Sequence, residues 1–274
     1  MYLGVDIGGT KTLVAVLDAN GVITERAKFP TSPNYDDFLK ELAATVATFT
    51  TQDYAAAGLA MPVTVFNREL GVGVGFGNLP WKNVPIHNDV ERIVGCPVAI
   101  ENDAKLGGLS EALMLKDTYH RVLYVTVSTG IGISLIVNGK TDTNFGDGGG
   151  RAMMFEHDGK VVPWESFASG RAIVERYGKR AVDITDEATW RHIARDLSLG
   201  FLEMIAMFQP DVIVVGGSVG TYFDRYGKFL SEAMQQYHLP LVPIPPIKGA
   251  QRAEEAVVYG CYDLAKETYG NTAR

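Results

Sequence analysis

Apolar residues along the chain fall mostly in short runs that end at glycine-rich or polar turns, which is the pattern of β-strands. The first run covers residues 2–7 and is broken only by Asp6; the turn Gly8-Gly9-Thr10-Lys11 and a second apolar run over 13–17 follow. This order predicts a β-hairpin close to the N-terminus. The next elements expected are a strand over 22–29, a helix over 36–49 and a strand over 55–61.

The second half of the chain repeats this order. A strongly apolar run over residues 122–127 leads into Ser128-Thr129-Gly130-Ile131-Gly132 and then into an apolar run over 133–137. Two copies of strand, turn and strand indicate an internal duplication of a β-β unit. The remaining elements expected are strands over 97–100 and 212–215 and helices over 88–94, 105–115, 164–177 (interrupted at Gly170), 187–207, 223–236 and 253–267.

Two glycine-rich segments are expected to be loops. Residues 63–85 carry glycine at positions 71, 73, 75 and 77, so this segment could fold closely over a ligand or form a flexible hairpin loop. The second segment is the glycine cluster over 146–150.

Composition and charge narrow the function. The chain has 274 residues, of which 46% are hydrophobic, and a formal net charge of -7. It has no basic stripe, so nucleic-acid binding is not expected. It also has no apolar run near the ~20 residues of a membrane span and no leader pattern at its start, so we expect a cytoplasmic protein without membrane contact. Cys96 and Cys261 are expected to be buried free thiols.

The first turn carries the chemistry of a phosphate-binding loop. Gly8 and Gly9 allow close approach of a ligand to the backbone, whose N–H groups can form an anion nest, while Thr10 adds a hydroxyl and Lys11 a cation. Asp6 would repel a phosphate, so its place at the strand end makes sense if a divalent metal lies between the two. The alternative is an ordinary hairpin with a surface lysine.

Polar or glycine-rich residues follow four of the predicted strands. They are Gly8-Gly9, Asn102-Asp103, Gly130 to Gly132, and Gly216-Gly217. Ligands collect at the carboxyl ends of strands in open α/β sheets. Four such ends in two repeated units therefore predict a cleft between two domains, with phosphates held from both sides.

Five segments of the chain resemble the ROK family, which belongs to the actin-like ATPase superfamily of sugar kinases. They span nearly the whole chain in the family's order and are Gly4-Val5-Asp6-Ile7-Gly8-Gly9-Thr10-Lys11, Asn78-Leu79-Pro80-Trp81, Glu101-Asn102-Asp103-Ala104, Ser128-Thr129-Gly130-Ile131-Gly132 and Val214-Val215-Gly216-Gly217. The resemblance implies an α/β fold of two actin-like (ribonuclease H-like) domains with a ligand cleft between them. Residues 1–115 with the C-terminal helix 253–268 would form a small sugar- and phosphate-binding domain, and 116–252 a large nucleotide-binding domain.

The function implied by the resemblance is that of an ATP- and Mg2+-dependent sugar kinase, most often a glucokinase that makes glucose 6-phosphate. The helix-turn-helix that precedes the kinase-like part of repressor members is not expected here. Dimers are common among such kinases, so a homodimer is compatible with the resemblance, although the sequence does not fix an interface.

The resemblance also assigns roles to single residues. Asp103 matches the family's catalytic base, a carboxylate that would take the proton of the attacking sugar hydroxyl; the alternative is a helix N-cap. Asn102 and Glu165 would bind sugar hydroxyls, although Glu165 could instead be an acid favoured by a helix dipole. The other implied roles are sugar binding by Asn78, metal organisation by Asp6, phosphate binding by Gly8, Gly9, Thr10, Lys11, Ser128, Thr129, Gly130 and Gly132, and adenosine binding by Gly216 and Gly217.

Three departures from the family pattern matter. Typical members have the segment Gly-Glu-x-Gly-His, whose glutamate and histidine contact the sugar and whose histidine also binds zinc. Residues 146–152 of this chain read Gly-Asp-Gly-Gly-Gly-Arg-Ala instead. The zinc-binding cysteines are missing as well, so no zinc is predicted and His157 is expected to be a surface loop residue. Lys105 replaces an asparagine of the family and is expected either in the cleft, where it would favour the charged form of Asp103, or solvated on its helix.

These departures leave other functions open. The protein could be a sugar- or nucleotide-binding protein with weak catalysis, because the sugar-binding pair of the family is incomplete. A polyphosphate-dependent glucokinase is a second alternative, because short, zinc-free members of the family include such enzymes. A DNA-binding repressor is disfavoured by the acidic balance of the chain.

Overall fold

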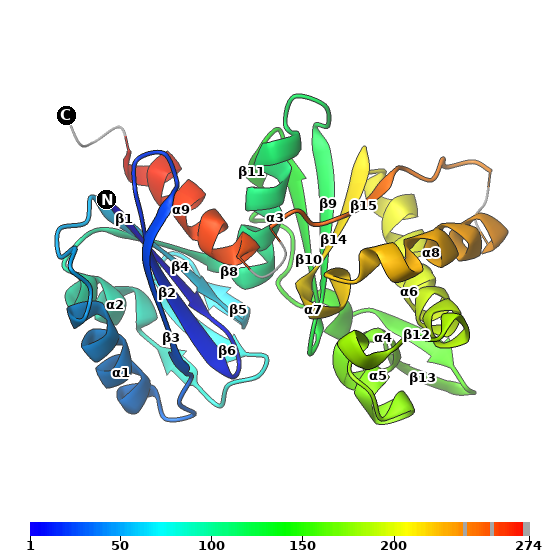
Figure 1. The fold of residues 1–274 in the computed structure, drawn as a ribbon, viewed down its shortest axis with the longest axis horizontal. Coiled ribbons are helices and arrows are strands. Elements are labelled where there is room, and N and C mark those ends of the chain that lie inside the picture. Colours follow the sequence, from blue (N-terminus) through cyan, green and yellow to red (C-terminus); the bar gives the residue numbers. More distant parts are fainter. Residues whose placement is uncertain (238–239, 253–254, 271–274) are drawn as a thin grey trace. The chain divides into compact units, whose positions relative to one another are not determined.

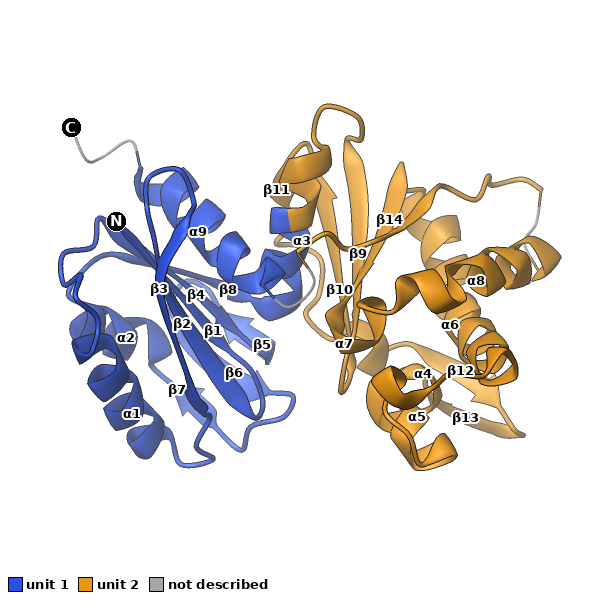
Figure 2. Ribbon diagram, viewed as in Figure 1, with its two compact units in different colours: residues 1–110, 255–274 blue, residues 111–254 orange. Residues whose placement is uncertain are grey.

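A computed structural model describes residues 1–237, 240–252 and 255–270. The chain forms two compact units, residues 1–110 together with 255–274, and residues 111–254 (Figure 2). The predicted start of the C-terminal helix at residues 253 and 254 lies outside the described residues.

The first unit is built on a five-stranded sheet (Figure 1). Its order is β3 (Ile23–Pro30), β2 (Lys11–Leu17), β1 (Tyr2–Ile7), β4 (Ala56–Met61) and β8 (Val98–Asn102). β2 runs antiparallel to β1 and β3, whereas β1, β4 and β8 are parallel. The predicted N-terminal hairpin is therefore confirmed.

Alternation along β1 explains how both faces of this sheet are covered. Leu3, Val5 and Ile7 pack with α1 (Tyr35–Ala47) and α2 (Ile86–Val94) in one cluster. Tyr2 belongs to the opposite cluster, which contains α9 (Ala256–Tyr269). Successive side chains of a strand point to opposite faces, so a run without polar alternation is buried on both sides.

Helix α9 approaches the sheet at Gly58 and helix α3 (Asp103–Leu115) at Gly260 too closely for a side chain at either glycine. A Cβ atom added to Gly58 would lie 1.9 Å from the carbonyl oxygen of Cys261, and one added to Gly260 would lie 2.0 Å from that of Leu106. These contacts attach α9, which follows the second unit in the chain, to the first unit.

The predicted loop over residues 63–85 is wrong. It contains a three-stranded antiparallel sheet of β5 (Val63–Asn67), β6 (Val72–Phe76) and β7 (Lys82–Val84). The alternating glycines of β6 follow the period of a strand, and the ring of Phe76 takes the space beside Gly73, where a Cβ would lie 2.4 Å from it.

The second unit repeats the strand order of the first. Its sheet runs β11 (Lys140–Thr141), β10 (Ile131–Val137), β9 (Arg121–Val127), β14 (Val212–Gly216) and β15 (Ile247–Gly249). As in the first unit, the first strand has an antiparallel neighbour on one side and a parallel neighbour on the other. The predicted internal duplication is confirmed at the level of topology.

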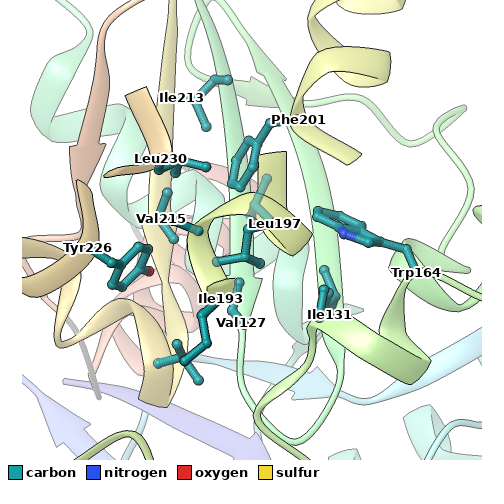
Figure 3. Packing of buried hydrophobic residues seen from close by; sticks show 14 of the residues in the cluster. Val127, Ile131, Trp164, Ile193, Leu197, Phe201, Ile213, Val215, Tyr226 and Leu230 are labelled. Atoms are coloured by element: carbon teal, nitrogen blue, oxygen red, sulfur yellow. The ribbon is translucent and has the colours of Figure 1, made fainter. Parts of the chain in front are cut away.

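One face of the second sheet carries the largest core of the described chain. α6 (Glu187–Phe208) and α8 (Phe223–Tyr237) pack on it, and Figure 3 shows Leu197, Phe201 and Leu230 among the buried side chains. A smaller cluster on alternate strand positions includes Ala112 of α3 (Asp103–Leu115).

The segment between β11 and α6 is more structured than its sequence indicates. Residues 154–163 form the hairpin of β12 (Met154–His157) and β13 (Lys160–Pro163), and the glycine cluster ends in a short 3-10 helix, Gly149–Arg151. The predicted helix over 164–177 is broken at Ser169 into α4 (Glu165–Ala168) and α5 (Gly170–Tyr177), and the Ser169 hydroxyl caps α5. The remaining short helices are α7 (Gly217–Gly220) and the 3-10 turn Ala181–Asp183. Among the described residues, no helix is long and apolar enough to span a bilayer.

Helix α3 carries the chain from the first unit into the second. Glu111, on the second-unit side of the boundary, is buried, and its carboxylate accepts the backbone N–H groups of Gln251 (2.9 Å) and Arg252 (2.7 Å). Within the second unit, one side chain thus joins the segment that enters the unit to a segment near its end.

Candidate functional site

The β1–β2 turn is fixed by hydrogen bonds from a distant threonine. The Gly8 N–H donates to the Lys11 carbonyl at 2.9 Å, and Thr31 donates its hydroxyl to the Gly8 carbonyl at 2.8 Å. The Thr31 hydroxyl also lies 2.9 Å from the buried hydroxyl of Thr12. Thr10 and Lys11 are exposed at the turn, where their polar groups face solvent.

Gly9 and Asn78, which the sequence places far apart, are brought together here. A Cβ atom on Gly9 would lie 2.7 Å from the Cβ of Asn78. The glycine therefore has a second use besides the turn, because it lets the segment after β6 pack directly on the turn.

Two carboxylates, those of Asp6 and Asp103, interact electrostatically near the carboxyl ends of β1 and β8. Burial and the charge of Asp103 raise the pKa of Asp6 to about 7, and the charge of Lys28 opposes this. Lys28 lies on the same row of the sheet as Asp6, with Leu13 between them. The structure thus groups the two acids that the sequence assigned to metal and to base.

Asn102, predicted to bind sugar, is engaged with the backbone. It is buried, its Oδ1 accepts the N–H of Ala104 at 2.9 Å, and its Nδ2 donates to the Val63 carbonyl at 2.9 Å. Ala104 N also lies 2.8 Å from Asp103 Oδ1, so both side chains cap the start of α3. In this structure Asn102 holds Asp103 at the first turn of its helix.

An ion pair that the sequence did not predict supports the segment from Glu101 to Asp103. The buried Glu101 carboxylate accepts Nε and Nη2 of Arg68, and its Oε1 also accepts the Asn102 N–H at 2.8 Å. Bidentate arginine–carboxylate pairs of this kind are strong and directional. No local pattern could have shown it, because Arg68 lies in the unpredicted β5–β6 hairpin.

The expectation of a solvated Lys105 is wrong. Only 1% of this residue is exposed, since residues 104–112 of α3 are buried on every side and leave no solvent face.

In the second unit, Ser128 joins three elements. Its carbonyl accepts the N–H of Gly170 at the start of α5 (2.7 Å), and its Oγ accepts the N–H of Ser218 in α7 (3.0 Å). Its own N–H donates to the Gly130 carbonyl at 2.8 Å within the turn, and Thr129 is exposed at the tip. The β9–β10 turn is therefore attached to the loop that follows β14.

At Gly216 and Gly217, which end β14 and begin α7, there is no room for a side chain. Gly217 has a φ of +82°, and a Cβ there would lie 2.5 Å from Ser128 Oγ and 2.6 Å from Thr126 Oγ1. A Cβ on Gly216 would lie 2.2 Å from the Tyr124 hydroxyl. Hydroxyls and backbone N–H groups thus gather at this strand end, where they can donate to an anion.

Glu165 lies against the β9–β10 turn. Its Oε2 accepts the N–H of Ile131 at 2.9 Å, and a Cβ on Gly130 would lie 2.3 Å from that oxygen. Its Oε1 accepts Nη2 (3.0 Å) and Nε (3.2 Å) of Arg151. Gly132, the other glycine of the turn, lies under the 3-10 helix, with its Cα 3.2 Å from where a Cβ of Gly149 would be.

The prediction that His157 is a surface loop residue is wrong. It lies on β12 and stacks on Phe167 with ring centroids 4.1 Å apart. The predicted loop is a hairpin whose inner side packs on the core, and this places the ring against Phe167.

A divalent cation fits Asp6 and Asp103. Burial and the charge of Asp103 raise the pKa of Asp6, and a cation beside the two carboxylates would oppose both effects. Mg2+ is commonly held by one or two carboxylates together with phosphate oxygens. The described residues contain no group of three or more His, Cys, Asp or Glu side chains that could hold a metal, so further ligands would come from phosphate or water.

Comparison with known proteins finds one family and relatives that are named as sugar kinases. The ROK family model matches residues 2–268. A glucokinase of Streptomyces coelicolor is 27% identical, with 97% of this chain and 98% of that protein covered. An N-acetylmannosamine kinase of Vibrio cholerae is 28% identical, with 88% and 93% covered.

A solved structure shows the fold. The crystal structure of a ROK family glucokinase from Streptomyces griseus in complex with glucose and AMPPNP matches with a TM-score of 0.83 at 24% identity, covering 97% of this chain and 99% of that one. The chain accordingly has the actin-like α/β fold that its sequence predicted.

Proposed function

The chain belongs to the ROK family, and we propose that it is a sugar kinase that transfers the terminal phosphoryl group of ATP to a hexose hydroxyl. Glucose is the first candidate acceptor, because a glucokinase covers almost the whole chain in the comparison. The observation that supports the proposal most is the electrostatic interaction between Asp6, near the end of β1, and Asp103, directly after β8 of the same sheet.

Asp103 is the proposed general base. As the sugar hydroxyl attacks, its proton passes to the Asp103 carboxylate, a bond forms between the sugar oxygen and the γ-phosphorus, and the bond from that phosphorus to the leaving ADP oxygen breaks. Asp103 is the first residue of helix α3, whose start is capped by Asn102, and this holds the proposed base in place. Asn78, Asn102 and Glu165 remain candidates for sugar contacts.

Asp6 would hold Mg2+, which supplies positive charge to the phosphate oxygens as the transfer proceeds. Thr10 and Lys11 at the exposed turn are proposed as further phosphate donors. In the second unit, the turn from Ser128 to Gly132 is proposed to donate N–H and hydroxyl groups to phosphates, and the Gly216-Gly217 loop to face the adenosine.

N-acetylmannosamine is a second candidate acceptor, favoured by the 28% identity to an N-acetylmannosamine kinase. A polyphosphate donor and a binding protein with weak catalysis remain the other proposals from the sequence.

The test is a coupled assay with Mg-ATP over a panel of hexoses and N-acetylhexosamines, with polyphosphate as a second donor. We expect turnover on one sugar and a loss of about 10^3-fold or more in Asp103→Asn, because the base is removed while its shape is kept. Asp37→Asn, an exposed acid of α1, is the matched control and should leave the rate unchanged. A folded wild type that binds sugar or nucleotide but turns over none of these pairs would overturn the kinase proposal in favour of a binding protein.

A further inference from the structure

Glu165 is engaged at both carboxylate oxygens by groups of its own unit. One oxygen accepts the Ile131 N–H in the β9–β10 turn, and the other accepts the Arg151 guanidinium. Its side chain is only 16% exposed, so these contacts take up most of its polar surface.

The pair is held rigidly on both sides. Trp164, which precedes Glu165, is fully buried and donates its Nε1–H to the Asp196 carbonyl at 3.0 Å. Figure 3 shows Trp164 beside Ile131, and a Cβ on Gly150, next to Arg151, would contact both side chains. The glycine cluster therefore brings Arg151 against the turn, and the core fixes the start of α4.

The Ile131 N–H lies inside the turn that the proposed function assigns to phosphates. A carboxylate that accepts this N–H restrains the backbone at that point, and the guanidinium stabilises the charge of the carboxylate and fixes its rotamer. Arginine is suited to this role because its planar fork is already organised for a carboxylate.

We infer that Arg151 and Glu165 are a positioning pair that fixes the Ser128–Gly132 turn for the nucleotide phosphates, an inference that rests on the proposed kinase function. The pair acts through the backbone of the turn and has no proton-transfer role. Loss of the Arg151 guanidinium weakens nucleotide binding, whereas the Glu165 carboxylate, a candidate sugar contact, is still present.

Steady-state kinetics separate this role from a direct contact between Glu165 and sugar. Arg151→Met keeps the apolar stem and removes the guanidinium; we expect a KM for ATP raised about tenfold, as for the loss of a charged hydrogen bond, with the KM for sugar within about twofold of wild type. Arg151→Lys should recover part of the loss, and Glu165→Gln, which also changes a candidate sugar contact, should raise the KM for ATP as well. A raised KM for sugar with an unchanged KM for ATP would overturn the inference.

The matched control is the Arg176–Asp196 pair of the same unit. Its side chains are 36% and 14% exposed, against 39% and 16% for Arg151 and Glu165, and it does not touch the turn. Arg176→Met should therefore leave both KM values unchanged.

Hydrogen exchange of the Ile131 amide tests the inference without any activity. We expect exchange at least about tenfold faster in Arg151→Met than in wild type, and unchanged in Arg176→Met. If the wild type proves not to be a kinase, this measurement still decides whether the pair restrains the turn. Equal exchange rates of the Ile131 amide in wild type and Arg151→Met would overturn the inference that the pair restrains the turn.

Discussion

The β1–β2 turn and the β9–β10 turn occupy the same place in two sheets of identical strand order, yet their chemistry differs. The penultimate residue of the first strand is Asp6 in one unit and Thr126 in the other, and both are half-buried. The first turn is held from outside by Thr31, whereas the second is held through Ser128 and Glu165. The two units share the strand order, whereas the side chains at the strand ends differ: one unit has a negative carboxylate there and the other has neutral hydroxyl groups.

The largest expected effect tests the charged half of this comparison. Asp6→Asn should lower kcat by about 10^2- to 10^3-fold, because the carboxylate proposed to hold Mg2+ becomes a neutral amide. Thr126→Val, the matched change in the second unit, removes a hydroxyl only and should cost about tenfold or less. Both are measured by steady-state assays over a range of Mg2+ concentrations. Equal losses in the two variants would contradict a special role for the charge.

Glycine substitutions compare the two loops in stability. Gly217→Ala introduces a side chain at a φ of +82° and against the Ser128 hydroxyl, so we expect a loss of about 3 kcal/mol in the free energy of unfolding. Gly9→Ala meets only Asn78 and should cost about 1–2 kcal/mol. Urea titrations followed by circular dichroism measure both values, and a larger loss for Gly9→Ala would show that the first turn is the more constrained.

Acid titration should affect the first unit through Asp6. Since the folded-state pKa is raised to about 7 from 3.8, the folded chain binds this proton more tightly than the unfolded chain does. In metal-free buffer, stability from this group is full below about pH 4, declines as the pH rises to 7 and stays low above it, by a few kcal/mol at most. Asp6→Asn should remove this decline in urea titrations at several pH values. A decline that persists in the variant would place its origin elsewhere.

The smallest effect expected comes from the core of the second unit. The Tyr226 hydroxyl is buried without a hydrogen-bond partner, and burial raises the pKa of this tyrosine. Tyr226→Phe should be neutral or stabilise the protein by up to about 1 kcal/mol, with unchanged kinetics. This variant shows whether the stability of the second unit can change without any change at its turn. A clear loss of stability would mean that the hydroxyl has a partner, such as a buried water.

The pattern of the sequence was sufficient for elements whose side chains follow one clear period. The β1–β2 hairpin, the β9–β10 repeat and helix α6 were found in this way. Residues 63–85 and 154–163 were missed because glycines and turn residues conceal the period of short strands. For Lys105 the sequence left two environments open, and the solvated one is wrong because residues 104–112 are all buried, which the local sequence does not reveal.

The candidate site was predicted in two ways: from residues that directly follow strands, and, for Asn78 and Glu165, from the family resemblance. Asp6, Asp103 and the three glycine turns were identified from their places at strand ends, while their roles stay predictions. The supporting pairs Arg68–Glu101 and Arg151–Glu165 join residues separated by 33 and 14 positions, with side chains that meet only after the chain has folded. Each glutamate accepts a backbone N–H of a predicted functional segment, and the two arginines, to which the sequence assigned no role, support these glutamates.

Helix α9 determines the order in which the protein can be completed during synthesis. The ribosome finishes the second unit before it makes α9, although α9 covers one face of the first sheet and packs on Gly58. The N-terminal sheet, with Asp6 at its strand end, therefore emerges first but lacks part of its core until the last helix arrives. Released chains truncated after residue 254 should hold a folded second unit and an incomplete first one, so the part of the candidate site that is synthesised first is completed last.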